Sequence, residues 1–362
     1  MATNSELFYR MKSVFNGGFG ALETSAANTA MKIRLKRQLG QFMEPTDVIS
    51  PEYKKEIDTY WKPYHKVDTR YFAWYSSRNG ICDPRYIPDD LYYTVIDQYF
   101  NNRKYGWGVN DKNYYSLLFP DVKQPEIVVR KINNIFYDAD YHIIPQSEAI
   151  RICISEDAVI IKPANETGGS RGIRFWTQES SKDDFVKKVS GGGTSLVVQR
   201  LIKQHKVLNE IHPDSVNTLR IMTLIIGDEV RHVSTVLRMG VGGNKVDNAS
   251  AGGITCGVKE DGQLKEIAFN AHGEKFDQHP QGYHFSDCIV PGYRDAVAMA
   301  KHCHEKMGHF RLVSWDVAIG DRGEPILIEA NLRNGECDFH QFNNGPLFGD
   351  LTDQVLKEVF HK

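Results

Sequence analysis

Short apolar runs bounded by turn residues recur between residues 126 and 330, and they predict a chain rich in β-strands. The stretches 126–130 and 134–137 are close enough together to form a hairpin. Residues 218–226 and 232–238 flank a Gly-Asp turn and predict an antiparallel pair. Further strands are expected at 158–163, 173–176, 195–199, 312–319 and 325–330.

Helices are expected mainly at the N-terminal end and near residue 300. Residues 1 to about 65 are polar, mixed in charge and helical in character, and 69–120 are rich in aromatic and turn residues. A helix is predicted at 291–307, because proline stands at its start and Gly308 just past its end. Shorter helices are expected at 92–100 and 182–189, and a glycine-rich loop at 240–253. The pattern predicts an α+β fold with mainly antiparallel sheets and a helical, aromatic-rich N-terminal region.

Composition excludes several classes of protein. The 362 residues carry a formal net charge of -2, which argues against a dedicated nucleic-acid binder, and no apolar run approaches the roughly 18 residues that span a bilayer. The six cysteines contain no CxxC pair, so we expect neither a zinc site nor a disulfide framework, but a reducing cytoplasm. The basic run Lys32, Arg34, Lys36 and Arg37 is better explained by a solvated helix face than by contact with an acidic surface or lipid.

The last predicted hairpin carries the clearest chemical signal. If Arg322-Gly323 is a two-residue turn, Asp316 lies directly opposite Glu329, and Asn331 shares a face with Glu329. Like charges placed opposite each other destabilise a sheet unless something neutralises them. A hard cation such as Mg²⁺ prefers oxygen ligands of these types. A metal site is therefore predicted here, with an exposed acidic sheet face as the alternative.

A second candidate site follows the strand that ends at Lys162. The next residues, up to Gly172, contain several glycines and lead to another strand. Such a loop can present backbone N–H groups to phosphate oxygens, with the lysine as a point charge. It is not a Walker A motif, because no Gly-Lys-Ser/Thr follows and the next element is a strand. Taken alone, the loop is equally consistent with a surface turn.

Together these features resemble the ATP-grasp superfamily. That superfamily places a lysine before a glycine-rich flap, then a hinge segment that holds adenine, and Asp…Glu-x-Asn metal ligands near the end. The matching positions here are Lys162, 168–172, 199–202, and Asp316 with Glu329-Ala330-Asn331. The stretch from Gln204 to Ile221, with Asp247-Asn248 and Gly252-Gly253, is similar to the sugar-transfer-associated ATP-grasp family of polysaccharide biosynthesis. The resemblance covers about residues 111–345.

The resemblance implies an ATP-grasp fold, in which two α+β subdomains sandwich ATP, with Mg²⁺ as the metal. It implies phosphate contacts from Lys162 and the flap, and adenine contacts from the hinge. A second phosphate lysine is expected at Lys112 or Lys131, and His205 is expected either near the ribose or in a structural role. The implied cofactor-binding residues are Lys112, Lys131, Lys162, Gly168, Gly169, Ser170, Arg171, Gly172, Gln199, Leu201, Ile202 and His205, and the implied metal ligands are Asp316, Glu329 and Asn331.

Three arginines are candidate catalytic residues. Arg220 lies in the middle of an apolar strand, where a permanently charged guanidinium needs an anionic partner. A transferring phosphoryl group or acyl phosphate fits, and a structural ion pair is the alternative. Arg238 lies on the predicted return strand, and Arg333 follows Asn331 by two residues.

We expect three regions: 1–110, helical and substrate-side; 111–202, the N-subdomain with the flap; and 203–362, the C-subdomain with the metal site. The implied function is an ATP-dependent carboxylate–amine ligase that forms an acyl phosphate. Its expected substrates are small carboxylates and amines such as sugar acids, amino sugars or amino acids in capsule or other surface polysaccharide, with polysaccharide biosynthesis enzymes as partners. A kinase of a sugar hydroxyl and a nucleotide-binding scaffold are the alternatives.

Overall fold

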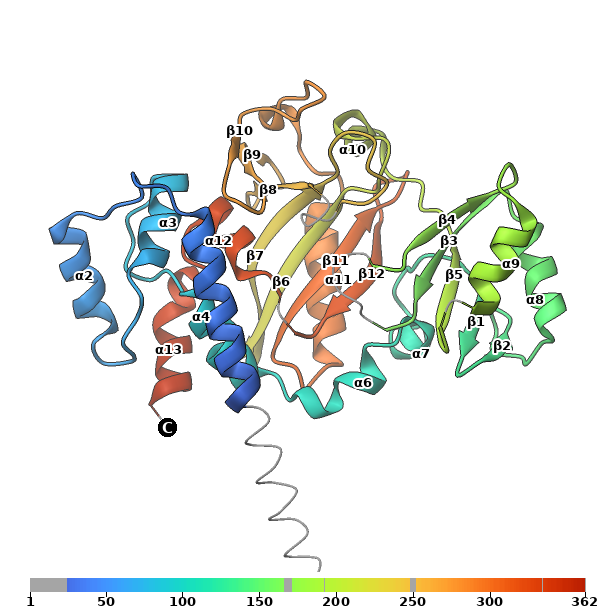
Figure 1. The fold of residues 1–362 in the computed structure, drawn as a ribbon, viewed down its shortest axis with the longest axis horizontal. Coiled ribbons are helices and arrows are strands. Elements are labelled where there is room, and N and C mark those ends of the chain that lie inside the picture. Colours follow the sequence, from blue (N-terminus) through green and yellow to red (C-terminus); the bar gives the residue numbers. More distant parts are fainter. Residues whose placement is uncertain (1–24, 166–170, 192, 248–251, 334, 362) are drawn as a thin grey trace, which may run out of the picture.

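The computed structural model describes residues 25–165, 171–191, 193–247, 252–333 and 335–361. Figure 1 shows a five-stranded sheet at one end of the molecule, a seven-stranded sheet in the middle and the N-terminal helices at the other end. All strand pairs in both sheets are antiparallel, as the hydrophobic pattern predicted.

The five-stranded sheet has the order β2-β1-β5-β3-β4. Its strands are β1 (Ile127–Ile132), β2 (Ile135–Tyr137), β3 (Ala158–Pro163), β4 (Arg174–Thr177) and β5 (Leu196–Arg200). The predicted hairpin of β1 and β2 is confirmed, and its turn places Asn133 and Asn134 at positive φ, which asparagine tolerates. Helices α8 (Gln146–Ile154) and α9 (Lys182–Gly191) bury apolar side chains on this sheet and complete its own core.

The seven-stranded sheet has the order β10-β9-β8-β7-β6-β11-β12. Its strands are β6 (Thr218–Ile226), β7 (Glu229–Met239), β8 (Ile254–Val258), β9 (Leu264–Phe269), β10 (Lys275–Phe276), β11 (Leu312–Ile319) and β12 (Pro325–Asn331). The predicted helix near residue 300 is α11 (Tyr293–Glu305), which packs on one face of this sheet. The opposite face packs against the N-terminal helices. It also packs against two C-terminal helices, α12 (Cys337–Asn344) and α13 (Thr352–Phe360).

The N-terminal region is helical, and the predicted helix at 92–100 is confirmed as a π-helical turn followed by α5. A helix at residues 25–42 precedes α2 (Pro51–Trp61), α3 (Arg70–Asn79), α4 (Asp89–Leu91), η1 (Tyr92–Ile96) and α5 (Asp97–Phe100). Then follow η2 (Arg103–Tyr105), α6 (Gly106–Val109), η3 (Lys112–Tyr114) and α7 (Tyr115–Leu118). Short helices elsewhere are α10 (Lys206–Ile211), η5 (Phe285–Asp287) and η6 (Gly349–Leu351).

The N-terminal aromatic residues do not form a separate core. Trp61, Phe72 and Tyr75 pack in one cluster with Met222 and Leu224 of β6 and Phe342 of α12. None of the helices in the described part of the chain has the length and apolar character of a membrane span.

Candidate active site

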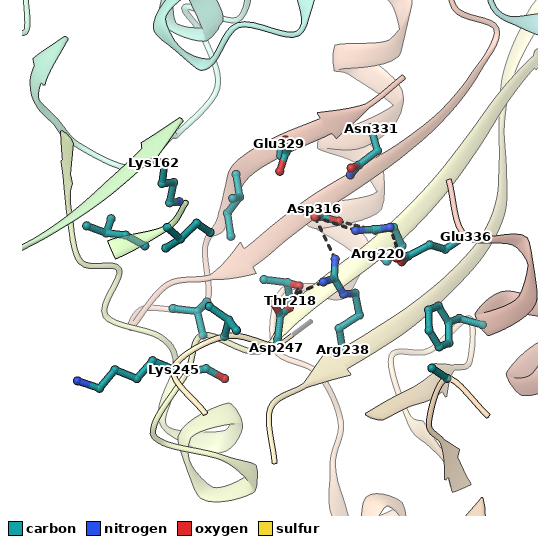
Figure 2. A pocket seen from close by; sticks show the side chains of 18 of the residues that line it. Lys162, Thr218, Arg220, Arg238, Lys245, Asp247, Asp316, Glu329, Asn331 and Glu336 are labelled. Atoms are coloured by element: carbon teal, nitrogen blue, oxygen red, sulfur yellow. Dashed lines mark hydrogen bonds and ion pairs between the residues drawn. The ribbon is translucent and has the colours of Figure 1, made fainter. Parts of the chain in front are cut away.

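A cavity of about 970 Å³ lies between the two sheets and extends to the N-terminal helices. The five-stranded sheet contributes Lys162 and Gln199 to its wall, and the seven-stranded sheet contributes Arg220, Asp316 and Glu329. Figure 2 shows how the side chains from both sheets converge on this space. The cavity therefore joins the two candidate sites that the sequence placed about 150 residues apart.

The hairpin of β11 and β12 brings Asp316 opposite Glu329, as predicted, but by a different route. Near the turn, Ile319 pairs with Pro325, so the pairing differs by one residue from that of a two-residue turn. A β-bulge between Asp316 and Val317 then restores the predicted pair. Because the bulge offsets the wider turn, the carboxylates of Asp316 and Glu329 both line the cavity.

The charge of Asp316 is balanced by arginines. Its Oδ1 accepts from Arg220 Nε at 2.5 Å, and its Oδ2 accepts from Arg220 Nη2 at 3.0 Å and from Arg238 Nη1 at 3.1 Å. Burial alone would raise the pKa of Asp316, but the two guanidinium groups outweigh it and hold this pKa below its ordinary value. The remaining Arg220 nitrogen, Nη1, donates to Glu336 Oε2 at 2.6 Å.

Two lysines face the same space from different elements. Lys112 Nζ donates to Glu329 Oε1 at 2.6 Å, and the backbone N–H of Lys112 bonds to the carbonyl of Ala164 at 2.9 Å, just past β3. Burial and then the nearby charge of Lys112 lower the pKa of Lys162 to about 8. A buried ammonium with a lowered pKa gains charge stabilisation from an incoming anion. The two carboxylates are thus neutralised by Lys112 and the arginines, and the repulsion expected between Asp316 and Glu329 is not left uncompensated.

The oxygen donors present fit a hard cation. Asp316 and Glu329 are in register on adjacent strands, and Asn331, 8% exposed, lies beside them, where its Nδ2 donates to Ser314 O at 3.2 Å (Figure 2). Two carboxylates and one amide oxygen are a donor set that Mg²⁺ accepts, with phosphate and water as further ligands. In the described part of the chain, no group of three His, Cys, Asp or Glu residues is placed to hold a metal.

The hinge segment after β5 offers a place for a base. Gln199 is 5% exposed and lines the cavity, and its Oε1 has no hydrogen-bond partner among the described residues. Leu201 and Ile202 line the same wall. A buried amide oxygen without a donor is costly, and an exocyclic amine of a bound base would supply that donor.

A comparison with protein-family models identifies the family to which this chain belongs. The model of the sugar-transfer associated ATP-grasp family matches residues 94–356. The chain belongs to this family. A comparison with curated protein sequences finds no match.

A comparison with solved structures finds similar chains of low identity. The chain is similar to a D-cycloserine synthetase (12% identity, TM-score 0.40, covering 68% of this chain and 70% of that chain). It is also similar to an L-amino acid ligase from Bacillus licheniformis (16%, 0.39, 68% and 48%) and to a D-alanine–D-alanine ligase from Bacillus anthracis (12%, 0.39, 69% and 66%). The chain thus spans only about half of the second structure.

Several of the residues that the sequence singled out lie in the cavity wall, and others do not. Lys112, Lys162, Gln199, Leu201, Ile202, Arg220, Arg238, Asp316, Glu329 and Asn331 line the cavity. Gly168, Gly169, Ser170 and Asn248 lie outside the described residues. Arg171 and Gly172 are exposed and are not part of the lining, and Gly172 has a φ of +84° that favours glycine.

Three candidates are not among the residues that line the cavity. The Lys131 ammonium donates to the carbonyls of Ser190 at 2.9 Å and Gly193 at 2.8 Å, so the lining favours Lys112 as the second lysine. His205 caps α10, where its Nδ1 accepts from Val207 N at 3.2 Å, which is the structural role that the sequence left open. Arg333 packs against Gly106, since a Cβ there would lie 3.0 Å from its Nη2.

Sequence reasoning missed the role of Glu336 and the pairing of Asp247. Glu336 has a φ of +55° and turns back to Arg220, a conformation that no sequence pattern predicts for glutamate. Asp247 accepts from the Thr218 hydroxyl and lies 3.6 Å from Arg238 Nη2. Burial raises the pKa of Asp247, although Arg238 opposes this effect. The sequence signal for this residue was its family signature with Asn248, which assigned it no partner.

Proposed function

We propose that the protein is an ATP-dependent carboxylate–amine ligase. The observation that carries this proposal is one cavity in which Lys112, Lys162, Arg220 and Arg238 meet the three oxygen donors of the candidate metal site, with additional space that reaches the N-terminal helices. A nucleotide with its metal needs only part of a cavity of this kind. The remaining volume can hold the other substrates beside the phosphate end.

Different residues of the cavity wall contact the phosphates, the base, the metal and the transferring phosphoryl group. Lys112 and Lys162 neutralise phosphate oxygens, and Gln199 with the hinge backbone orients the base. Asp316, Glu329 and Asn331 hold Mg²⁺, which supplies charge neutralisation on the phosphates when it is bound. Arg220 and Arg238 are held by Asp316 and so need not reorient as charge develops on the transferring phosphoryl group.

The proposed reaction has two steps. A carboxylate oxygen attacks the γ-phosphorus, the bond to the β,γ-bridging oxygen breaks, and ADP leaves with an acyl phosphate remaining. The neutral amine nitrogen then attacks the acyl carbon, the bond from this carbon to the phosphate oxygen breaks, and the nitrogen releases one proton as the amide forms and phosphate leaves. The protein acts by positioning and charge neutralisation and needs no covalent nucleophile.

Within this proposal, the substrate is a sugar acid, an amino sugar or an amino acid of surface polysaccharide, such as a capsule. The family description names sugar transfer, which supports a sugar-linked substrate. Partners from polysaccharide biosynthesis belong to the same proposal. We also propose that the protein acts in the cytoplasm, since all six cysteines are unpaired. The three-region division at 110 and 202 remains part of the proposal.

The test is a screen that measures ADP release from ATP, with each of a set of carboxylates combined with each of a set of amines, at several millimolar Mg²⁺. Stoichiometric ADP, free phosphate and an amide product are the expected result. ADP with a phosphorylated acceptor would instead identify a kinase. Nucleotide binding without turnover across the panel would identify a scaffold.

A further inference from the structure

The cavity has a second acidic region, where α4 and α12 line its wall. Asp89 of α4 and Asp338 of α12 both line the cavity. Asp89 is 6% exposed, and Asp338 Oδ1 is buried with no hydrogen-bond partner among the described residues. The Tyr75 hydroxyl donates to Asp89 Oδ1.

These acids differ from Asp316 and Glu329 in what balances them. Asp316 and Glu329 each have a cationic side chain within 2.6 Å. Within the described residues, neither Asp89 nor Asp338 forms an ion pair with a lysine, arginine or histidine. A buried carboxylate without a cation is costly, so this region favours a cation from outside the chain.

The walls around the acids suit an organic cation. Tyr71, Trp74, Tyr93 and Phe339 line this end of the cavity, and aromatic faces attract ammonium groups and pack against carbon skeletons. Trp74 is 3% exposed, and its Nε1 has no acceptor among the described residues. The region therefore offers two carboxyl groups, which accept hydrogen bonds from an ammonium group when they are ionised, and one N–H donor, which matches a hydroxyl or ether oxygen.

We propose that Asp89, Asp338 and Trp74 form the binding site for the amine co-substrate, and that this substrate is a hydroxyl-bearing primary amine of the amino-sugar or amino-alcohol class. This inference rests on the proposed ligase function, which requires an amine. Asp338 lies two residues after Glu336, whose carboxylate holds Arg220, so the amine site is continuous with the site of phosphoryl transfer.

The protonation of the pair gives the site a pH dependence. Burial, and then the charge of Glu336, raises the pKa of Asp338 to about 7, while Arg220 opposes this shift. Burial and the charges of Asp338 and Asp90 raise the pKa of Asp89 well above its ordinary value, although Tyr75 opposes this. The other titratable groups close to Asp89 and Asp338 are Tyr71, Tyr92, Tyr93 and Cys337. The exposed Arg34 of helix 25–42 lines the same cavity. An ammonium must displace a proton to bind here, so affinity should rise with pH and binding should release protons.

The experiment measures binding of D-glucosamine and of its neutral counterpart D-glucose to the full chain by calorimetry, without nucleotide. We expect D-glucosamine to bind roughly tenfold more tightly or better, the scale of a charged hydrogen bond. Asp338→Asn and Asp89→Asn should each abolish this preference, while Asp321→Asn, in the exposed turn after β11, should retain it. Equal affinity for the two sugars, or a preference that persists in both cavity variants, would overturn the proposal.

Further measurements separate this inference from the ligase function. The affinity for Mg·ADP should stay within about twofold in all three variants, because none of these residues is assigned to the nucleotide. Ethanolamine, whose amine stays protonated, should bind more tightly at about pH 8 than at about pH 6, and Asp338→Asn should remove this slope. If Asp89→Asn fails to fold, Trp74→Phe, which keeps an aromatic ring but removes the N–H donor, should weaken D-glucosamine binding. Preferential amine binding without any amide product would refute the ligase function alone, whereas amide formation with an unchanged amine KM in Asp338→Asn would refute this site alone.

Discussion

At the scale of single residues, Arg220 joins the predicted metal site to α12. Its guanidinium donates to both Asp316 oxygens and to Glu336. A lysine keeps the charge but cannot bridge these two acids. We expect Arg220→Lys to keep ATP affinity within a few-fold and to lower kcat by roughly 10²-fold. Melting temperature, nucleotide affinity and kcat are measured on one preparation.

The matched control is Arg231→Lys on β7, where the arginine is half exposed and lies 3.6 Å from Glu229. This variant should leave all three quantities unchanged. A lower melting temperature with normal kcat in Arg220→Lys would assign Arg220 a purely structural role.

Asp316 is also expected to stabilise the fold without metal. Asparagine in its place leaves the buried guanidinium groups of Arg220 and Arg238 without their shared counter-charge, which costs about 3 kcal/mol of unfolding free energy for a broken buried pair. Glu329→Gln should cost less, because Lys112 and Glu329 are less completely buried than Arg220 and Asp316. Both variants should lose turnover. A gain in metal-free stability of Asp316→Asn would show that repulsion between the carboxylates dominates instead.

Lys162 makes a prediction about protons. Its pKa of about 8 should rise when phosphate oxygens bind beside it, because an anion favours the charged form. Nucleotide binding at about pH 8 should therefore take up part of a proton, and the uptake should vanish near pH 6, where the lysine is already charged. Calorimetry in two buffers of different ionisation enthalpy measures this. Arginine is always charged, so Lys162→Arg should show no proton uptake on nucleotide binding. If this variant takes up as much proton as the original protein, Lys162 is not the source of the uptake.

At the scale of elements, the β11–β12 hairpin shows what the sequence could and could not predict. The pattern of apolar residues predicted both strands, and the assumption of a two-residue turn at Arg322-Gly323 predicted the pairing of Asp316 with Glu329. It did not predict the wider turn or the bulge that cancels it, because turn length and bulges depend on packing against neighbouring elements. Gly320 N bonds to Glu324 O at 2.8 Å, and this contact closes the actual turn.

The conformation of the segment between β12 and α12 could not be predicted from the sequence either, because it also depends on packing against a neighbouring strand. Gly335 packs so closely on Ser314 that an added Cβ would clash with its hydroxyl, and this contact places Glu336 beside Arg220. We expect Gly335→Ala to displace Glu336, lowering kcat roughly tenfold with a smaller change in nucleotide affinity. Steady-state kinetics and nucleotide titration check this.

Ser314→Ala supplies the control. Alone, it removes one hydrogen bond to Gly335 O and should have little effect. Combined with Gly335→Ala, it relieves the clash and should restore part of kcat. No recovery in the double variant would show that the displacement has another cause.

At the scale of the molecule, the sequence predicted an aromatic-rich N-terminal region but could not predict which elements its aromatic side chains pack against. Composition marked residues 69–120 as rich in aromatic residues, yet nothing local shows that Phe72 and Tyr75 pack in one cluster with residues of α12 and β6. Such contacts join segments more than 140 residues apart, and only the folded chain brings them together. The strands β8 to β10 were missed because they are short and partly polar.

The apolar clusters of the two sheets are separate, and the nucleotide is expected to bridge them. Trp176 and Phe185 belong to the cluster of the five-stranded sheet, whereas Trp61, Trp74 and Trp315 belong to the other two. The proposed phosphate contacts come from Lys162 on one side and from Lys112 and Arg220 on the other. We therefore expect two thermal transitions without ligand, the first of them from the five-stranded sheet, and closer or merged transitions with a non-hydrolysable ATP analogue and Mg²⁺.

Tryptophan fluorescence assigns the two transitions. Loss of the Trp176 signal in Trp176→Phe should remove the first fluorescence transition while calorimetry still detects it. Val159→Ala, a buried change in the strand that carries Lys162, should lower the first transition by several degrees and leave the second in place. A control change in the other core, Ile57→Val, should shift only the second. One transition that both variants lower equally, without ligand, would show that the sheets already unfold as a single cooperative unit and that the nucleotide is not what couples them.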